Sequence, residues 1–246
     1  MKISKTVGLI LACGLAAGAS AQQRGVNMGP AMGTGAGGQH GGFGGDSPTI
    51  YSQPSQSPDG YFSDGVPGQY WSQRQADNFM LDNNYMVDGI RWWGSSENYT
   101  TPDLSNFSDF VIEFYNDAGG IPGSSIGAFT IPVGNANAVP TGLQNGLGGI
   151  EYKMESSIGI ALQGGVPYWV SVGSVQIDPS LDGFAWSSNL TDGDGVAAFD
   201  FFDGGGYQSF FLGADGAFEL MGAIPTPGAG ATLGLAALLA ARRRRA

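Results

Sequence analysis

The sequence predicts an all-β fold, a two-sheet antiparallel sandwich of the jelly-roll type. Composition is the first observation: charged residues make up only 13% of the 246 residues, whereas aromatic residues make up 11% and glycine supplies 43 positions. Few charges, many aromatic residues and many turn-forming residues are typical of β-rich domains. The second observation is that short apolar segments with a period of two alternate with glycine turns. The third is that no long segment of the body has helical periodicity.

The body of the domain begins near Gly60, after the low-complexity segment, so we expect the sandwich over residues 59–223. The segment 107–116 has the clearest period of two, with Phe110, Ile112 and Phe114 on one face and the intervening residues on the other. Glycine- and aspartate-containing turns separate the strands. The expected strands are residues 79–82, 85–94, 107–116, 127–133, 149–155, 159–163, 167–175, 184–188, 196–202, 209–213 and 217–224.

The N-terminal residues MKISKTVGLILACGLAAGASAQ have the three parts of a secretory signal peptide. Two lysines precede an apolar stretch, which ends in Ala-Ser-Ala. We therefore predict a signal peptide over residues 1–21, cleaved between Ala21 and Gln22. An alternative is lipid attachment at Cys13, although Leu11 fits that pattern poorly. Because Cys13 is the only cysteine, the mature chain is expected to form no disulfide.

Residues 22–58 are rich in Gly, Ser, Gln and Pro and lack apolar periodicity, which predicts a disordered linker. The only histidine, His40, lies in this segment. It has no neighbouring ligand residue and no rigid scaffold, so we expect it to be solvated rather than to bind a metal or act as a catalytic base.

The distribution of charge excludes nucleic acid as a partner. Of the ten basic residues, six lie in the terminal segments, and all 21 acidic residues lie between them. A body this acidic repels a phosphate backbone. Divalent cations and neutral sugars suit its charge better.

Paired carboxylates are the one catalytic arrangement that the composition leaves open, since glycosidases use two carboxyl groups about 5–10 Å apart. The glutamates that could form such a pair are Glu97, Glu113, Glu151, Glu155 and Glu219. We expect them to be solvated surface residues. The sequence therefore predicts no catalytic residue and no enzyme, with a secreted glycan-acting hydrolase as the alternative.

The segment TDGDG at 191–195 raises the question of calcium, because Asp192 and Asp194 alternate as they do at the start of an EF-hand loop. The residues that follow lack the glycine and the glutamate that complete such a loop. A tight polar turn is the simpler interpretation, so no metal or other cofactor is expected. Calcium bound at Asp192 and Asp194 remains the alternative.

The tryptophans pose a similar choice between a sugar-stacking surface and the core. They are Trp71, Trp92, Trp93, Trp169 and Trp186. Adjacent residues of one strand face opposite ways, so one of Trp92 and Trp93 should lie in the core and the other outside it or under a loop. We expect core packing to be the usual role of these side chains.

Several segments of the body are similar to lectin-like β-sandwich domains of secreted bacterial proteins. The matching segments are Asp77-Asn78-Phe79, Trp92-Trp93-Gly94, Phe110 to Gly123, Tyr168 to Val172, Trp186 and Phe218-Glu219-Leu220. The resemblance covers roughly residues 70–224. It implies the sandwich fold and leaves the activity open.

The last 23 residues, IPTPGAGATLGLAALLAARRRRA (224–246), combine a proline break, an apolar run and four arginines. The run from Ala229 to Ala241 would span about 20 Å as a helix, against a hydrocarbon core of about 30 Å. Such a helix is a marginal membrane span. The positive-inside rule places Arg242 to Arg245 in the cytoplasm and the body outside.

This three-part order resembles the PEP-CTERM sorting signal of Gram-negative bacteria, with Pro225-Thr226-Pro227 in place of Pro-Glu-Pro and Arg242, Arg243, Arg244 and Arg245 as the basic cluster. The resemblance implies processing by an exosortase-type membrane transpeptidase. It also implies delivery to the cell surface or the extracellular matrix, with membrane contact through the C-terminal helix of the precursor. A permanent tail anchor is the alternative.

The sequence thus predicts a non-enzymatic exported protein of the surface or matrix. Polysaccharide is the ligand that we expect for its sandwich.

Overall fold

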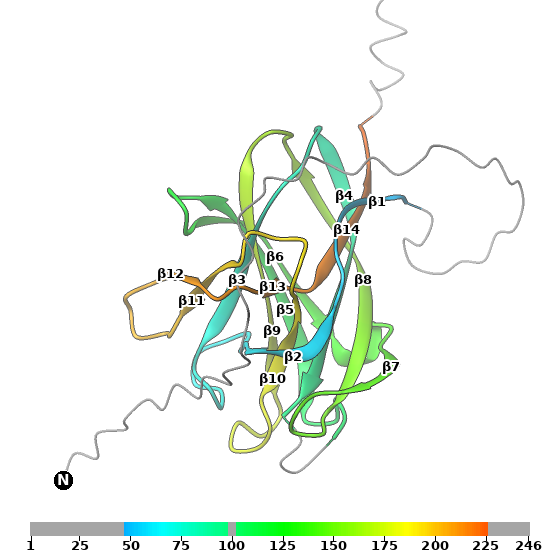
Figure 1. The fold of residues 1–246 in the computed structure, drawn as a ribbon, viewed down its shortest axis with the longest axis vertical. Helices are drawn as coiled ribbons and strands as arrows, with labels where there is room; N and C mark the ends of the chain where they lie inside the picture. The colour runs from blue at the N-terminus through cyan, green and yellow to red at the C-terminus, as the bar shows by residue number, and fades with distance from the viewer. Residues whose placement is uncertain (1–46, 98–101, 226–246) are drawn as a thin grey trace, which may run out of the picture. The chain divides into compact units, whose positions relative to one another are not determined.

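The computed structural model describes residues 47–97 and 102–225 and confirms an all-β sandwich of two antiparallel sheets (Figure 1). The predicted signal peptide, His40 and the predicted sorting signal from Thr226 onward lie outside the described residues. Within the described ranges, no helix has the length and apolarity needed to span a membrane.

The first sheet, sheet A, is built around β4 (Tyr85–Ser96). One edge of β4 pairs with β8, and the other edge pairs first with β14 and then with β10. Beyond these, β1 pairs with β14, β2 and β13 pair with β10, and β7 pairs with β8. The other strands of sheet A are β1 (Thr49–Gln53), β2 (Ser57–Phe62), β7 (Val139–Gln144), β8 (Ile150–Leu162), β10 (Phe184–Asn189), β13 (Asp215–Gly216) and β14 (Phe218–Ala223).

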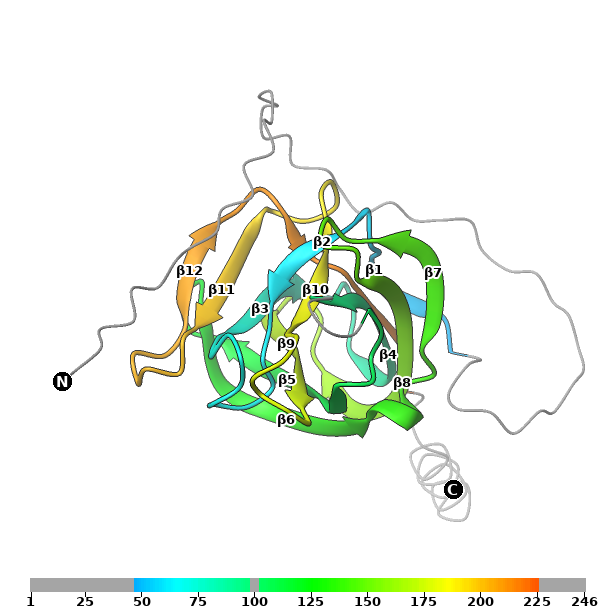
Figure 2. The same ribbon diagram turned by 90° about the horizontal axis from the view of Figure 1, so that it is seen from below.

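The second sheet, sheet B, has the strand order β12-β11-β3-β9-β5-β6. Figure 2 shows β12 and β11 on one side of the sandwich and β7 and β8 on the other. The only helical segment in the described part of the chain is the short 3₁₀ turn η1 (Val133–Asn135) after β6. The strands of sheet B are β3 (Arg74–Met80), β5 (Phe107–Asp117), β6 (Pro122–Pro132), β9 (Pro167–Gln176), β11 (Val196–Asp200) and β12 (Gln208–Phe211).

The core lies between the sheets and follows the predicted alternation. Phe110, Ile112 and Phe114 of β5 are each 0% exposed, which confirms the face predicted for this strand. From sheet A, Trp92 packs edge-on against Phe110, with ring centroids 5.4 Å apart. Burial of each such side chain stabilises the fold by about 1.5–3 kcal/mol.

The predicted boundary between linker and sandwich is wrong, because the sandwich begins at Thr49 instead of residue 59. Strand β1 lies entirely within the predicted linker, and β2 starts there. Tyr51 of β1 stacks on Phe218 with ring centroids 5.1 Å apart, and Gln53 is 1% exposed. The strand forms here because Ile50 and Tyr51 pack against the core and Gln53 donates to the buried carboxylate of Asp77, contacts that composition does not show.

Two further differences concern the strands near β8. The predicted segments 149–155 and 159–163 are one continuous strand, β8, whose register against β4 shifts between Val87 and Gly89. Strand β7 was not predicted, and all six of its residues are exposed. An edge strand without a buried face has no alternating pattern to reveal it. At the other end, β14 finishes at Ala223, the predicted boundary.

Candidate functional site

The outer face of sheet B, which points away from the core, carries a group of contacting polar and aromatic side chains. On β3, Phe79 lies in the core, so Arg74 and Ala76 face outward. Register extends this face to the neighbouring strands, since Ala76 lies opposite Ser171 of β9 and Ala198 of β11. These small side chains form a low floor in the middle of the outer face.

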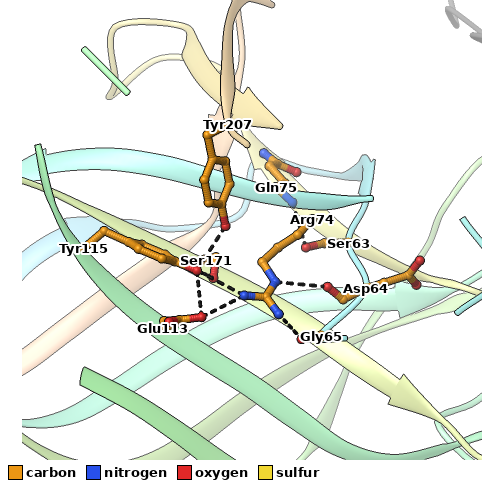
Figure 3. Close-up of polar contacts among 9 residues, drawn as sticks. All are labelled: Ser63, Asp64, Gly65, Arg74, Gln75, Glu113, Tyr115, Ser171 and Tyr207. Atoms are coloured by element: carbon orange, nitrogen blue, oxygen red, sulfur yellow. Dashed lines mark hydrogen bonds and ion pairs between the residues drawn. The ribbon is translucent and has the colours of Figure 1, made fainter. Parts of the chain in front are cut away.

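Arg74 is the centre of a hydrogen-bonded network on this face (Figure 3). Its Nη1 atom donates to Oε2 of Glu113 at 2.7 Å and to the hydroxyl of Tyr115 at 3.1 Å. Its Nη2 and Nε atoms donate to the carbonyls of Gly65 and Asp64. The side chains of Arg74 and Glu113 retain only 13% and 18% exposure. The guanidinium therefore joins β3, β5 and the segment after β2.

The segment after β2 passes from one sheet to the other. The N–H of Ser63 donates to the carbonyl of Phe184 in β10, and the N–H of Ser174 in β9 donates to the carbonyl of Ser63. Asp64 is buried beside Ser174, and its Oδ1 accepts from Nε2 of Gln176 at 3.1 Å. Burial raises the pKa of Asp64 to about 6, although hydrogen bonds to its carboxylate act in the opposite direction.

Tyr207 reaches the network from the segment between β11 and β12. Its hydroxyl donates to that of Tyr115 at 3.1 Å, and the two ring centroids lie 5.4 Å apart. The hydroxyl of Tyr115 in turn donates to Oε2 of Glu113 at 2.8 Å and lies 3.4 Å from Oγ of Ser171. Burial raises the pKa of both phenols, so their hydroxyls stay protonated and donate hydrogen bonds.

Residues 201–207, called the strap here, connect β11 to β12 at the edge of sheet B, and two of their side chains reach the outer face. Tyr207 packs against the cluster that contains Ala76 and Ala198. Phe202 covers Arg74, with its ring centroid 5.3 Å from the guanidinium carbon. Phe202 also has a φ of 52°, a left-handed conformation that costs a non-glycine residue about 1–3 kcal/mol. The strap thus holds two aromatic rings against the face in a strained backbone.

Strand β12 forms one edge of sheet B, and its four residues are exposed. Phe211 lies opposite Val196, which packs against the outer-face cluster, so Phe211 is on the outer face. Its side chain is 80% exposed. Phe210 points the other way and packs against Phe199 and Phe201, at centroid distances of 5.8 and 6.3 Å. The phenyl ring of Phe211 is therefore free to contact a partner.

The glutamates considered as catalytic carboxylates were Glu97, Glu113, Glu151, Glu155 and Glu219. Each makes contacts within the domain. Arg91 binds Glu155 at 2.6 Å and Glu219 at 2.5 Å, and Arg74 binds Glu113. Glu151 is 1% exposed and accepts hydrogen bonds from three hydroxyls, those of Ser55, Thr141 and Ser187. Glu97 is 0% exposed and accepts from the indole of Trp71 at 3.0 Å. The expectation that all five are solvated is wrong for Glu97 and Glu151, because polar partners hold their carboxylates inside the domain.

Asp192 and Asp194 lie in the turn before β11. Oδ2 of Asp192 accepts from Nδ2 of Asn189 at 2.9 Å. Asp194 accepts from the N–H of Val196 at 2.9 Å and from Nδ2 of Asn78 at 3.1 Å. Both carboxylates thus bind groups of the turn and of its neighbouring strand. Among the described residues, no three His, Cys, Asp or Glu side chains are grouped so that they could hold a metal ion.

A pair of buried aspartates beneath this turn was not predicted. Oδ2 of Asp77 accepts from Nε2 of Gln53 at 2.7 Å and from the N–H of Gly216 at 2.6 Å, and Asp77 is 0% exposed. Both oxygens of Asp215 accept from the N–H of Gly195. Burial and the charge of Asp215 raise the pKa of Asp77 well above its ordinary value, and burial raises that of Asp215 to about 6.

The tryptophans are mostly buried, as expected. Trp92, Trp169 and Trp186 are at most 1% exposed, and Trp93, on the face opposite Trp92, is 9% exposed. Trp71 stacks on Phe62 with ring centroids 4.4 Å apart. The aromatic ring that is exposed on the outer face is instead that of Phe211, at 80%, and no sequence motif marks this residue.

Comparison with known proteins found no matching family model and no matching curated protein.

The outer face of sheet B therefore combines one exposed aromatic ring with paired hydrogen-bond donors and acceptors. Stacking and hydrogen bonding are what such a surface offers to a ligand. No sequence motif surrounds Arg74 or Tyr207, so the sequence alone does not mark them as parts of one site. Strand pairing and the strap bring them together.

Proposed function

We propose that this protein is a non-enzymatic component of the cell surface or extracellular matrix that binds polysaccharide through the outer face of sheet B. The observation that carries the proposal is Phe211, whose ring is 80% exposed at the edge of a face that holds the Arg74 network. Aromatic rings present an apolar face on which the C–H face of a sugar ring can stack, while polar neighbours bind its hydroxyls.

The charge of the body favours a neutral polysaccharide. Arg74 is already bound to Glu113 at 2.7 Å, and Arg91 is bound to two glutamates. Because these arginines are neutralised within the domain, a polymer of uronic acids or phosphates would meet net negative charge on this chain. Hydroxyl groups meet no such barrier.

Two observations support a binding role over hydrolysis. The five candidate glutamates all make contacts within the domain. A polymer could not reach the buried pair of Asp77 and Asp215 at Asp77, because this residue is 0% exposed. The two candidate glutamates that do lie together, Glu155 and Glu219, share Arg91 as an ion-pair partner, so this pair is already engaged within the domain.

Export and surface delivery rest on the two terminal segments. Cleavage after Ala21 would release the mature chain on the far side of the inner membrane. An exosortase-type membrane transpeptidase is the processing partner that we propose for the Pro225-Thr226-Pro227 segment and the arginine cluster. The linker then separates the sandwich from the new N-terminus.

Affinity electrophoresis in gels that contain dextran, mannan or galactomannan tests the binding function. The protein should migrate more slowly in at least one of these gels, and Phe211→Ala should abolish most of the retardation. Leu143→Ala is the matched control, because Leu143 is an exposed apolar residue, at 52%, on β7 of the other sheet. Equal loss in both variants, or no retardation of the wild-type protein in any gel, would refute the proposal.

A further inference from the structure

Two side chains of the strap, Phe202 and Tyr207, cover the part of the outer face of sheet B that the proposed ligand would need. Tyr207 presents a six-membered ring with one hydroxyl, and this side chain packs against the cluster of Ala76, Tyr115, Trp169 and Ala198. The hydroxyl donates to Tyr115, whose own hydroxyl contacts Glu113 and Ser171. A ring packed on one face and hydrogen-bonded at its rim is also how a pyranose would lie there.

We infer that the strap is a lid formed by the chain itself, and that Tyr207 fills a subsite for one sugar ring of a neutral polysaccharide. This inference rests on the proposed function and extends it from the exposed Phe211 to the covered part of the same face. Phe211 and Tyr207 belong to the same edge, since β12 begins directly after Tyr207.

The backbone of the strap is suited to a change of position. Phe202 has a φ of 52°, and Gly204 and Gly206 have φ values of 88° and 69°. A Cβ added at Gly204 or Gly206 would meet no atom within 4 Å, so the glycines are not needed for close packing. Phe202 is the strained position, whereas glycine adopts a left-handed φ without steric cost, so Gly204 and Gly206 can serve as flexible joints of the strap.

The groups beneath the strap suit sugar hydroxyls. The carboxylate of Glu113 accepts hydrogen bonds and the guanidinium of Arg74 donates them. This ion pair lies beside the hydroxyls of Tyr115 and Ser171. The pair is neutral as a whole, which favours an uncharged ligand over an anionic one. In this arrangement the wild-type protein binds the polysaccharide weakly, because only the fraction of molecules in which the strap is lifted can bind it.

Tyr207→Ala tests the inference in the gels used for Phe211→Ala. Loss of the internal ring should tighten binding of the retained polysaccharide about three- to tenfold, as expected when a competing aromatic contact is removed. Tyr207→Phe is the matched control. It keeps the ring in place and should change binding less than Tyr207→Ala does. In a second variant, Ser171→Phe in the Tyr207→Ala background, the new ring should fill the vacated subsite and cancel the gain.

Thermal melting followed by circular dichroism establishes that each variant is folded at the assay temperature. If Tyr207→Ala binds no more tightly than wild type while Phe211→Ala still loses binding, the strap is structural, and only the inference fails. If Ser171→Phe leaves the gain intact, the sugar lies elsewhere, and the inference is also overturned. If no variant binds any of the polysaccharides, the proposed function and the inference fail together.

Discussion

Three buried carboxyl groups, on Asp64, Asp77 and Asp215, should make the stability of this domain depend on pH. Burial raises the pKa of each, to about 6 for Asp64 and Asp215 and well above the ordinary value for Asp77. The folded state therefore holds these protons more tightly than the unfolded state does. The stability that they contribute is fully present below the unfolded pKa of 3.8 and is lost as the pH rises through the folded pKa.

We accordingly expect the melting temperature to rise when the pH is lowered from about 7.5 to about 5. Asp64→Asn should reduce this rise, because the amide cannot ionise; the contribution of one such group is about 1–3 kcal/mol. Calorimetry at a series of pH values measures the effect. A melting temperature that falls over this range in the wild-type protein would contradict the assignment of buried, proton-binding carboxyls.

Gly60 gives a second prediction at the residue scale. A Cβ at this position of β2 would lie 1.7 Å from the carbonyl oxygen of Trp186, whereas at Gly159 of β8 it would meet no atom within 4 Å. Gly60→Ala should destabilise the domain by about 2 kcal/mol or more through overpacking, and Gly159→Ala, its control, should have little effect. Urea denaturation separates the two, and equal midpoints would show that β2 does not approach β10 this closely.

At the scale of elements, period-two patterns predicted the strands that bury one face. The segment 107–116 is the clearest case, because its inward residues are all apolar. The period-two pattern did not predict strands β1 and β7, for two different physical reasons. In β1, Gln53 is buried through hydrogen bonds to Asp77 and Gly216, and in β7 no side chain is buried. A search for alternating apolar residues cannot detect a strand that buries a polar side chain or a strand that buries none.

The candidate site was less predictable than the fold. Arg74, Glu113 and Tyr207 come from three different parts of the chain, and neither spacing nor a motif relates them. Their contact depends on the register of β3 against β9 and of β9 against β5, and on the course of the strap. Sequence patterns specify which face a residue occupies more readily than which residues of other strands lie beside it.

Removal of β1 tests its contribution to the sandwich. A chain that starts at Pro54 keeps β2 but loses the stacking of Tyr51 on Phe218 and the hydrogen bond from Gln53 to the buried carboxylate of Asp77. We expect it to be about 3–5 kcal/mol less stable than a chain that starts at Ser47, from lost burial and an undersolvated carboxylate. Thermal melting of the two chains measures the difference. Equal melting temperatures would show that β1 adds nothing to the fold.

At the scale of the whole molecule, we propose that the sandwich is one part of an exported chain and that its two terminal segments specify the destination. In this proposal the proline break, the apolar run and the four arginines form a sorting signal that is removed from the mature protein. Mass spectrometry of protein from the native host should therefore find no peptide that contains Arg242 to Arg245. Replacement of the four arginines by alanine should weaken membrane retention of the precursor, because the positive-inside anchor is lost. An intact C-terminus on mature surface protein would support the permanent anchor instead.

The claim that the outer face of sheet B binds a neutral polysaccharide can be tested directly by nuclear magnetic resonance. The measurement is the change in backbone amide shifts of residues 47–225 as a soluble polysaccharide that retards the protein in gels is added. We predict changes at β11, the strap and β12, from Val196 to Phe211, and at the outward-facing residues of β3, with β7 and β8 unaffected. Shifts confined to sheet A, or none at saturating polysaccharide, would contradict the account.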